Sequence, residues 1–100
     1  MNAESAERVI HAVVHGRVQG VGYRAWTERQ AQAHGLSGWV RNRSDGTVEA
    51  VFAGKADVVA AMAELLKRGP PKSAVMNVEI SDSDASALRA GARFTVLPTL

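Results

Sequence analysis

The sequence predicts a single α+β domain in which an antiparallel sheet carries two helices on one face. Three observations support this fold class. Stretches that alternate apolar and polar residues, as strands do, are interrupted by two stretches with the apolar spacing of helices. A Ser44-Asp45-Gly46 turn joins two of the expected strands as a hairpin. The chain has 100 residues, enough for one hydrophobic core and too few for two domains.

The first half of the chain contains a tail, a strand and a helix. Residues 1–7 are small and polar and are expected to form a flexible tail, so that the domain spans 8–100. A strand follows from Arg8. Its helix-covered face is expected to consist of Ile10, Ala12 and Val14. Helical spacing then extends over about 23–34, and Gly35 stands where a left-handed residue often ends a helix.

The second half contains the hairpin, the clearest helix and two further strands. The hairpin strands are expected over 36–42 and 47–53. The helix is expected over 55–68, where an apolar stripe runs from an acidic first turn to a basic last turn. The remaining elements are a strand over 74–80, a polar loop over 81–91 and a short strand around Phe94 and Val96. With right-handed crossovers, this order of elements is the ferredoxin-like split βαβ arrangement.

A glycine-rich loop joins the first strand to the first helix, with the sequence Gly16-Arg17-Val18-Gln19-Gly20-Val21-Gly22-Tyr23-Arg24. Glycines let a backbone turn tightly and expose several N–H groups at once, and the positive end of the helix dipole adds to those groups. Arg24 contributes a charged planar fork that suits phosphate or carboxylate oxygens. The loop therefore predicts an anion site, and we expect the anion to be a phosphoryl group.

Two nucleotide-binding motifs are rejected for this loop. The segment 20–25 formally matches the dinucleotide fingerprint, but the acidic residue at the expected separation, Asp45, falls in the hairpin turn and not at the end of a parallel strand. The chain is also too short for a doubly wound sheet. A Walker A loop would need a Gly-Lys-Ser/Thr sequence, which does not follow.

A second constellation runs from Gly38 to Gly54 through the hairpin. Its simplest interpretation is a hairpin with basic residues on its exposed face. However, Asn42 ends a strand near the glycine loop, and a neutral amide can both donate a hydrogen bond to a water and accept one from it. We therefore expect Asn42 to position an attacking water and not to act as a nucleophile.

With these two segments the sequence resembles the acylphosphatase family. Both family signatures are present at the family's spacing, the first over 16–24 and the second over 38–54, and the resemblance covers about residues 8–97. The resemblance implies that the loop binds the substrate phosphate through backbone N–H groups and the Arg24 clamp, and that Asn42 orients the hydrolytic water. The phosphate-binding residues that it implies are Gln19, Gly20, Val21, Gly22, Tyr23 and Arg24.

The same resemblance implies a reaction, and this sequence departs from the family pattern at one place. The reaction is hydrolysis of the carboxyl–phosphate anhydride of acyl phosphates to carboxylate and inorganic phosphate by water attack, with no metal, cofactor or phosphoenzyme. The departure is the end of the chain, Leu97-Pro98-Thr99-Leu100, where family members often finish on an aromatic residue. It concerns the packing of the last strand and not the chemistry.

Composition and charge narrow the classes of partner expected for this protein. Twelve Lys and Arg against ten Asp and Glu give a formal charge of +2, too weak and scattered for a nucleic-acid binder but suited to a small anionic substrate. No apolar run approaches a membrane span, and residues 1–7 do not resemble a signal peptide. The sequence has no cysteine, which fits a reducing compartment. We expect a cytoplasmic monomer that binds an acyl phosphate, with no nucleic-acid or membrane partner.

An alternative is an acylphosphatase-like or ferredoxin-like domain that binds carbamoyl phosphate or another anion without turnover. Maturation proteins that handle carbamoyl phosphate are much longer and carry cysteine pairs, which this chain lacks. An RNA-binding sheet would expose aromatic residues. The positions expected on the open face of this sheet are instead His11, Val13, Thr47, Glu49, Val75 and Asn77. The three histidines are expected to be surface residues and not metal ligands, because a metal site needs three or four converging groups.

Overall fold

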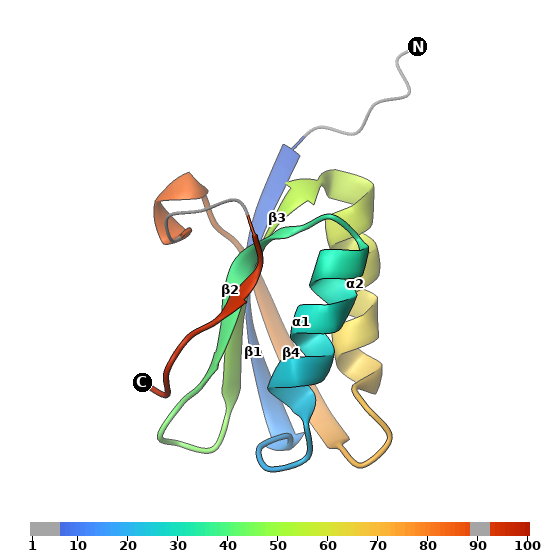
Figure 1. Ribbon diagram of the computed structural model, residues 1–100, viewed down its shortest axis with the longest axis vertical. Coiled ribbons are helices and arrows are strands. Elements are labelled where there is room, and N and C mark those ends of the chain that lie inside the picture. The colour runs from blue at the N-terminus through green and yellow to red at the C-terminus, as the bar shows by residue number, and fades with distance from the viewer. Residues whose placement is uncertain (1–6, 89–92) are drawn as a thin grey trace.

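The computed structural model describes residues 7–88 and 93–100, and their elements follow the predicted order (Figure 1). The helices and strands are β1 (Glu7–Arg17), α1 (Tyr23–Ala33), β2 (Ser37–Asn42), β3 (Val48–Lys55), α2 (Ala56–Arg68), β4 (Ala74–Asp82), the 3₁₀ turn η1 (Ala85–Ala87) and β5 (Thr95–Val96). Residues 1–6 of the expected tail lie outside the described residues, while Glu7 already belongs to β1. The expected loop over 81–91 is shorter than predicted, because β4 reaches Asp82 and η1 follows, and its residues 89–91 lie outside the described part.

The sheet has the strand order β4-β1-β3-β2-β5, and both helices cover the same face of it (Figure 1). The first four of these strands are antiparallel to their neighbours, as predicted. The expectation of a wholly antiparallel sheet is wrong at β5, which runs parallel to β2 with Thr95 opposite Trp39 and Val96 opposite Val40. The ferredoxin-like α+β fold is otherwise confirmed. None of the helices in the described ranges is long and apolar enough to cross a membrane.

The core lies between the sheet and the two helices. The apolar stripe of α2 buries Val59, Met62 and Leu66 completely, and full burial of one such side chain contributes about 1.5–3 kcal/mol. Helix α1 ends as predicted, with His34 as its C-cap and Gly35 next in the left-handed region at φ 69°. The strands contribute the apolar face that was predicted for β1, with Ile10, Ala12 and Val14 fully buried.

A β-bulge changes which residues of β4 face the core. The pairing of β1 with β4 shifts between His15 and Gly16, so that Gly16 lies opposite Val75 and His15 opposite Asn77, with Met76 as the extra residue. Val75 therefore packs against the core, while Met76 is 83% exposed. The prediction that placed Val75 on the open face is wrong, because strict alternation does not continue across a bulge.

The face of the sheet opposite the helices is more covered than predicted. Val13 is buried because Glu49 of β3 and Glu79 of β4 lie directly opposite it and flank it with long side chains. Thr47 is also buried, and its hydroxyl donates a 2.6 Å hydrogen bond to the Asp45 carboxylate. Trp39 lies on this face as well and donates from its indole to the Ala87 carbonyl of η1 at 2.8 Å.

Candidate active site

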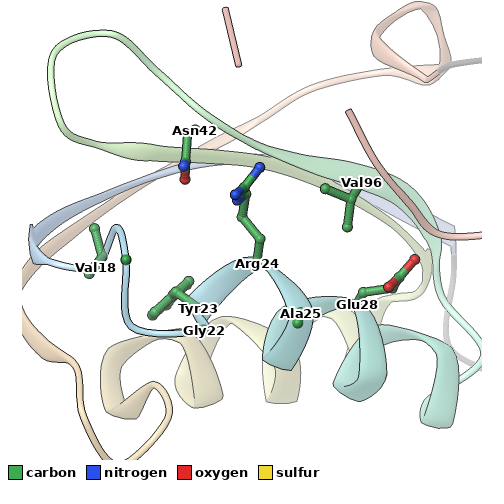
Figure 2. A pocket seen from close by; sticks show the side chains of 9 residues that line it. Val18, Gly22, Tyr23, Arg24, Ala25, Glu28, Asn42 and Val96 are labelled. Carbon is green, nitrogen blue, oxygen red and sulfur yellow. The ribbon is translucent and has the colours of Figure 1, made fainter. Parts of the chain in front are cut away.

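A pocket of about 300 Å³ lies where the glycine loop faces the end of β2 (Figure 2). Residues from the loop, α1, β2 and β5 surround it. Among the described residues, its lining consists of Val18, Gly20, Gly22, Tyr23, Arg24, Ala25, Glu28, Asn42 and Val96. The pocket thus brings together Arg24 and Asn42, which the sequence analysis singled out from two separate motifs.

The glycine loop and the first turn of α1 line one side of this pocket. Gly20 and Gly22 both adopt left-handed conformations, at φ 75° and 82°. They lie in the turn that connects Val18 to the start of α1. The first hydrogen bond of the helix runs from the Trp26 N–H to the Gly22 carbonyl at 3.0 Å, and Gly22 provides no side-chain cap. The N–H groups of the first turn, at residues 23–25, therefore have no acceptor within the helix. A helix start of this kind binds anions.

Arg24 is a half-buried cation with no anionic partner in the described part of the chain. None of the ion pairs formed among residues 7–88 and 93–100 involves its guanidinium. Its side chain extends from the first turn of α1 toward Asn42 (Figure 2). An uncompensated guanidinium beside free backbone N–H groups favours a dianionic ligand such as a phosphoryl group.

Asn42 is the last residue of β2, and its amide points into the pocket (Figure 2). Its Oδ1 atom is buried and accepts no hydrogen bond from any described residue. Leaving such an acceptor without a partner costs about 1–3 kcal/mol, so buried side-chain oxygens are nearly always paired with protein or water. This orphaned oxygen indicates a position where a water or a ligand donates a hydrogen bond.

Gln19 connects the two halves of the site. Its Nε2 atom donates to the carbonyl oxygens of Arg43 and Thr47, both at 2.8 Å, and so ties the glycine loop to the β2–β3 hairpin next to Asn42. Gln19 was expected to bind phosphate, but within the described chain neither Gln19 nor Val21 contributes to the pocket lining. Val21 instead packs against the hydrophobic core.

The side chain of Tyr23 is part of the hydrophobic core. Its ring is buried, 5.4 Å from the Trp26 ring centre, and its hydroxyl donates a 2.6 Å hydrogen bond to the Leu66 carbonyl near the end of α2. Burial raises the pKa of the Tyr23 phenol, which therefore stays protonated. Of the residues expected to bind phosphate, Gly20, Gly22, Tyr23 and Arg24 do line the pocket.

Sequence reasoning missed the far end of the pocket, formed by Ala25, Glu28 and Val96. Glu28 lies four residues after Arg24, a helical spacing that places the two side chains on one face of α1. That spacing is the signal which could have found it. Val96 arrives from β5, whose direction the sequence did not predict.

Arg41, His11 and His15 pair with glutamates on the open face of the sheet and do not line the pocket. Arg41, the neighbour of Asn42, donates from Nε to Glu49 Oε1 at 2.8 Å. Its guanidinium carbon lies 4.7 Å from the Trp39 ring centre, on the other face of the sheet. His11 and His15 pair with Glu49 and Glu79. In the described ranges no three His, Asp or Glu side chains converge as a metal site would require.

Comparison with known proteins assigns the family. The family model described as Acylphosphatase matches residues 10–96. The chain belongs to the acylphosphatase family. An acylphosphatase of Bradyrhizobium diazoefficiens is 54% identical over 95 residues, which are 92% of this chain and 96% of that protein. This confirms the resemblance inferred from the two motifs.

Solved structures agree with the assignment to the acylphosphatase family. The structure of an acylphosphatase from Coxiella burnetii superposes with a TM-score of 0.84 at 36% identity, covering 97% of this chain and 100% of that one. The crystal structure of full-length HypF superposes with a TM-score of 0.82 but is only 21% identical. This chain covers 13% of that protein, so the second likeness shows a shared fold alone.

Proposed function

We propose that the protein hydrolyses the carboxyl–phosphate anhydride of acyl phosphates, releasing carboxylate and inorganic phosphate. Membership of the acylphosphatase family supports the reaction class. The observation that carries the residue roles is a single pocket holding both the unpaired Arg24 guanidinium and the orphaned Asn42 oxygen. One group suits the phosphoryl group and the other suits a water.

In this proposal the loop and Arg24 hold the phosphoryl group. The free N–H groups at the start of α1 and the guanidinium donate to its oxygens and supply positive charge where negative charge is concentrated. Phosphoryl transfer needs little covalent help from the protein, since most of its catalysis is positioning and charge stabilisation. Groups that are fixed before substrate arrives supply both.

Asn42 positions the nucleophile. Its Oδ1 accepts a hydrogen bond from a water, whose oxygen attacks phosphorus while the bond from phosphorus to the acyl oxygen breaks. The carboxylate leaves with the bonding electrons, and a phosphate oxygen of the substrate accepts the proton of the water. The carboxylate of Glu28 points away from Asn42 (Figure 2), so we assign it no role as the base. The phosphoryl group is transferred directly to water, without a phosphoenzyme, and inorganic phosphate is released.

We also propose that the protein acts as a cytoplasmic monomer. A sequence with 22% charged residues and no cysteine suits an aqueous, reducing compartment.

Phosphate release from benzoyl phosphate in the presence of EDTA tests the proposal. We expect rapid hydrolysis by the wild type and a loss of about 100- to 1,000-fold in both Arg24→Gln and Asn42→Ala, the usual effect of removing one preorganised polar contact. The matched controls are Arg29→Gln, which removes an exposed guanidinium from the same helix, and Asn77→Ala, which removes an exposed amide from β4. Both controls should keep wild-type rates.

Circular dichroism of each variant separates loss of activity from loss of fold. A folded wild-type protein that releases no phosphate would contradict the proposal and leave the pocket as a binding site. Titration with carbamoyl phosphate and inorganic phosphate would then test the binding alternative. Loss of activity on adding EDTA would contradict the metal-free reaction alone.

A further inference from the structure

The two ends of the pocket differ in chemistry. One end contains the loop glycines, the Arg24 guanidinium and the Asn42 amide. The other end contains the small apolar side chains of Ala25 and Val96 and the carboxylate of Glu28, which points away from Asn42 (Figure 2). A molecule that fills the pocket therefore meets hydrogen-bond donors at one end and an apolar surface with a single acid at the other.

The carboxylate of Glu28 has no cationic partner within the described part of the chain. It is half-buried, and no ion pair among the described residues includes it. It lies one helical turn after Arg24, about 6 Å further along the axis of α1, and the two side chains do not form a salt bridge. Among the described lining residues, Arg24 and Glu28 are the charged ones. If Arg24 binds the phosphoryl group, Glu28 is left as the charge that the rest of the substrate meets.

The in-line geometry of phosphoryl transfer decides which part of the substrate reaches Glu28. In phosphoryl transfer the attacking and leaving oxygens are roughly in line through phosphorus. A water held by Asn42 approaches from one side, so the acyl group must leave on the side away from Asn42. That side is the end formed by Ala25, Val96 and Glu28. This step rests on the proposed function.

We propose that Glu28 selects among acyl phosphates by the charge of the acyl group. Ala25 and Val96 contact its apolar body, and the Glu28 carboxylate attracts an ammonium or similar cationic substituent. The same carboxylate repels an acyl group that carries a carboxylate or a second phosphate. The preferred substrates are thus acyl phosphates with a cationic acyl chain, and those with an anionic chain are disfavoured.

A matched pair of substrates tests the proposal. The pair is para-aminomethylbenzoyl phosphate, with a cationic ring substituent, and para-carboxybenzoyl phosphate, with an anionic one. We expect the ratio of their kcat/KM values, cationic over anionic, to fall about tenfold in Glu28→Gln, because attraction to one and repulsion of the other are lost together. Intrinsic reactivities of the two anhydrides cancel when the ratio is compared between variants. The ratio in the wild type should also shrink as salt is raised.

Glu64→Gln is the control, since it removes one exposed carboxylate from α2, outside the pocket, and should leave the ratio unchanged. A wild type that hydrolyses benzoyl phosphate but shows the same ratio as Glu28→Gln would overturn the role of Glu28 while the proposed function stands. A ratio that falls equally in Glu64→Gln would also overturn it, because the effect would then come from net charge. No hydrolysis of benzoyl phosphate by the wild type would overturn both proposals. If Glu28→Gln does not fold, a wild-type ratio that is independent of salt overturns the selection.

Discussion

Gln19 links the glycine loop, which lines the pocket, to the strand end that carries Asn42. Both hydrogens of its side-chain amide are used on carbonyl oxygens of the hairpin, at 2.8 Å each. The sequence places Gln19 within the phosphate-binding motif but gives no sign of this role, because its partners are backbone atoms 24 and 28 residues away. Arg24 and Asn42 could be predicted because their chemistry resides in their own side chains. Gln19 instead holds the glycine loop against the hairpin and so fixes the relative positions of other residues.

Replacement of Gln19 by alanine should weaken both the fold and the catalytic activity. Loss of two hydrogen bonds to half-buried carbonyls should lower the free energy of unfolding by about 1–3 kcal/mol. It should also lower kcat for benzoyl phosphate by about tenfold or more, because misplacing reacting groups by 1 Å can cost 100-fold. Urea unfolding and steady-state kinetics measure the two effects. Gln32→Ala, which loses one bond from its amide to the Phe94 carbonyl, should lose stability but keep kcat. Equal kcat values for wild type and Gln19→Ala would show that Gln19 serves the fold alone.

The β2–β3 hairpin carries different chemistry on its two faces. Asn42 enters the pocket, whereas Arg41 and Glu49 form a polar cluster on the other face, which we call the Glu49 cluster, together with His11. The Glu49 side chain is only 12% exposed and binds Arg41 at 2.8 Å and His11 at 2.7 Å. Burial raises the pKa of Glu49, but the hydrogen bonds from His11 and Arg41 outweigh it and leave the pKa below its ordinary value.

This lowered pKa predicts a loss of stability in acid. A carboxylate whose pKa is lower in the folded state contributes stability above its unfolded pKa, and that contribution is lost as the pH falls through the folded value. The free energy of unfolding should therefore fall as the pH decreases from about 5 to 3. In Glu49→Gln it should be lower than in the wild type at pH 7, and the difference should shrink across this window. Urea unfolding at several pH values measures this. Glu64→Gln should follow the wild-type curve, and parallel curves for Glu49→Gln and the wild type would contradict the prediction.

At the level of elements, the order could be predicted but the detail of β4 could not. Apolar residues occupy every second position over 74–80, at Ala74, Met76, Val78 and Ile80, and that pattern by itself places Met76 in the core. The extra residue opposite Gly16 reverses the assignment for Met76 and Val75. The signal was present in β1 and not in β4, since an isolated glycine within a strand often marks a bulge. A Cβ at Gly16 would overlap the carbonyl oxygen of Ala74, so close approach of the two backbones requires glycine there.

For the molecule as a whole, the C-terminal segment completes the pocket. β5 places Val96 beside α1, and the chain continues along β2, where Leu97 donates to the Val40 carbonyl and Leu100 to that of Asn42. The sequence predicts a short strand here, but the antiparallel direction expected for it is wrong, and its place in the site was not predicted. The polar segment before it has no periodicity from which its path could be inferred. The pocket role of Glu28 was missed for a related reason, because Val96, which lines the same end of the pocket, comes from this segment.

Phe94 fixes the C-terminal segment to the core, and we expect its truncation to affect both stability and substrate binding. The side chain is 1% exposed and stacks on Phe52 with ring centres 5.2 Å apart. Phe94→Ala should lower the free energy of unfolding by about 3–5 kcal/mol, the usual effect of emptying a buried aromatic site. In the fraction that stays folded, KM for benzoyl phosphate should rise more than kcat falls, because Val96 would no longer be held at the acyl end while Arg24 and Asn42 keep their places.

The control for this experiment is Leu100→Ala, since that side chain is 63% exposed and lies at the end of the same segment. It should change stability and KM little. Phe94→Leu, which keeps much of the buried apolar volume, should recover most of the stability and restore KM with it. Recovery of stability without recovery of KM would show that the aromatic ring itself positions Val96. A kcat that falls as far as in Asn42→Ala would instead contradict the separation of the acyl end from the reacting groups.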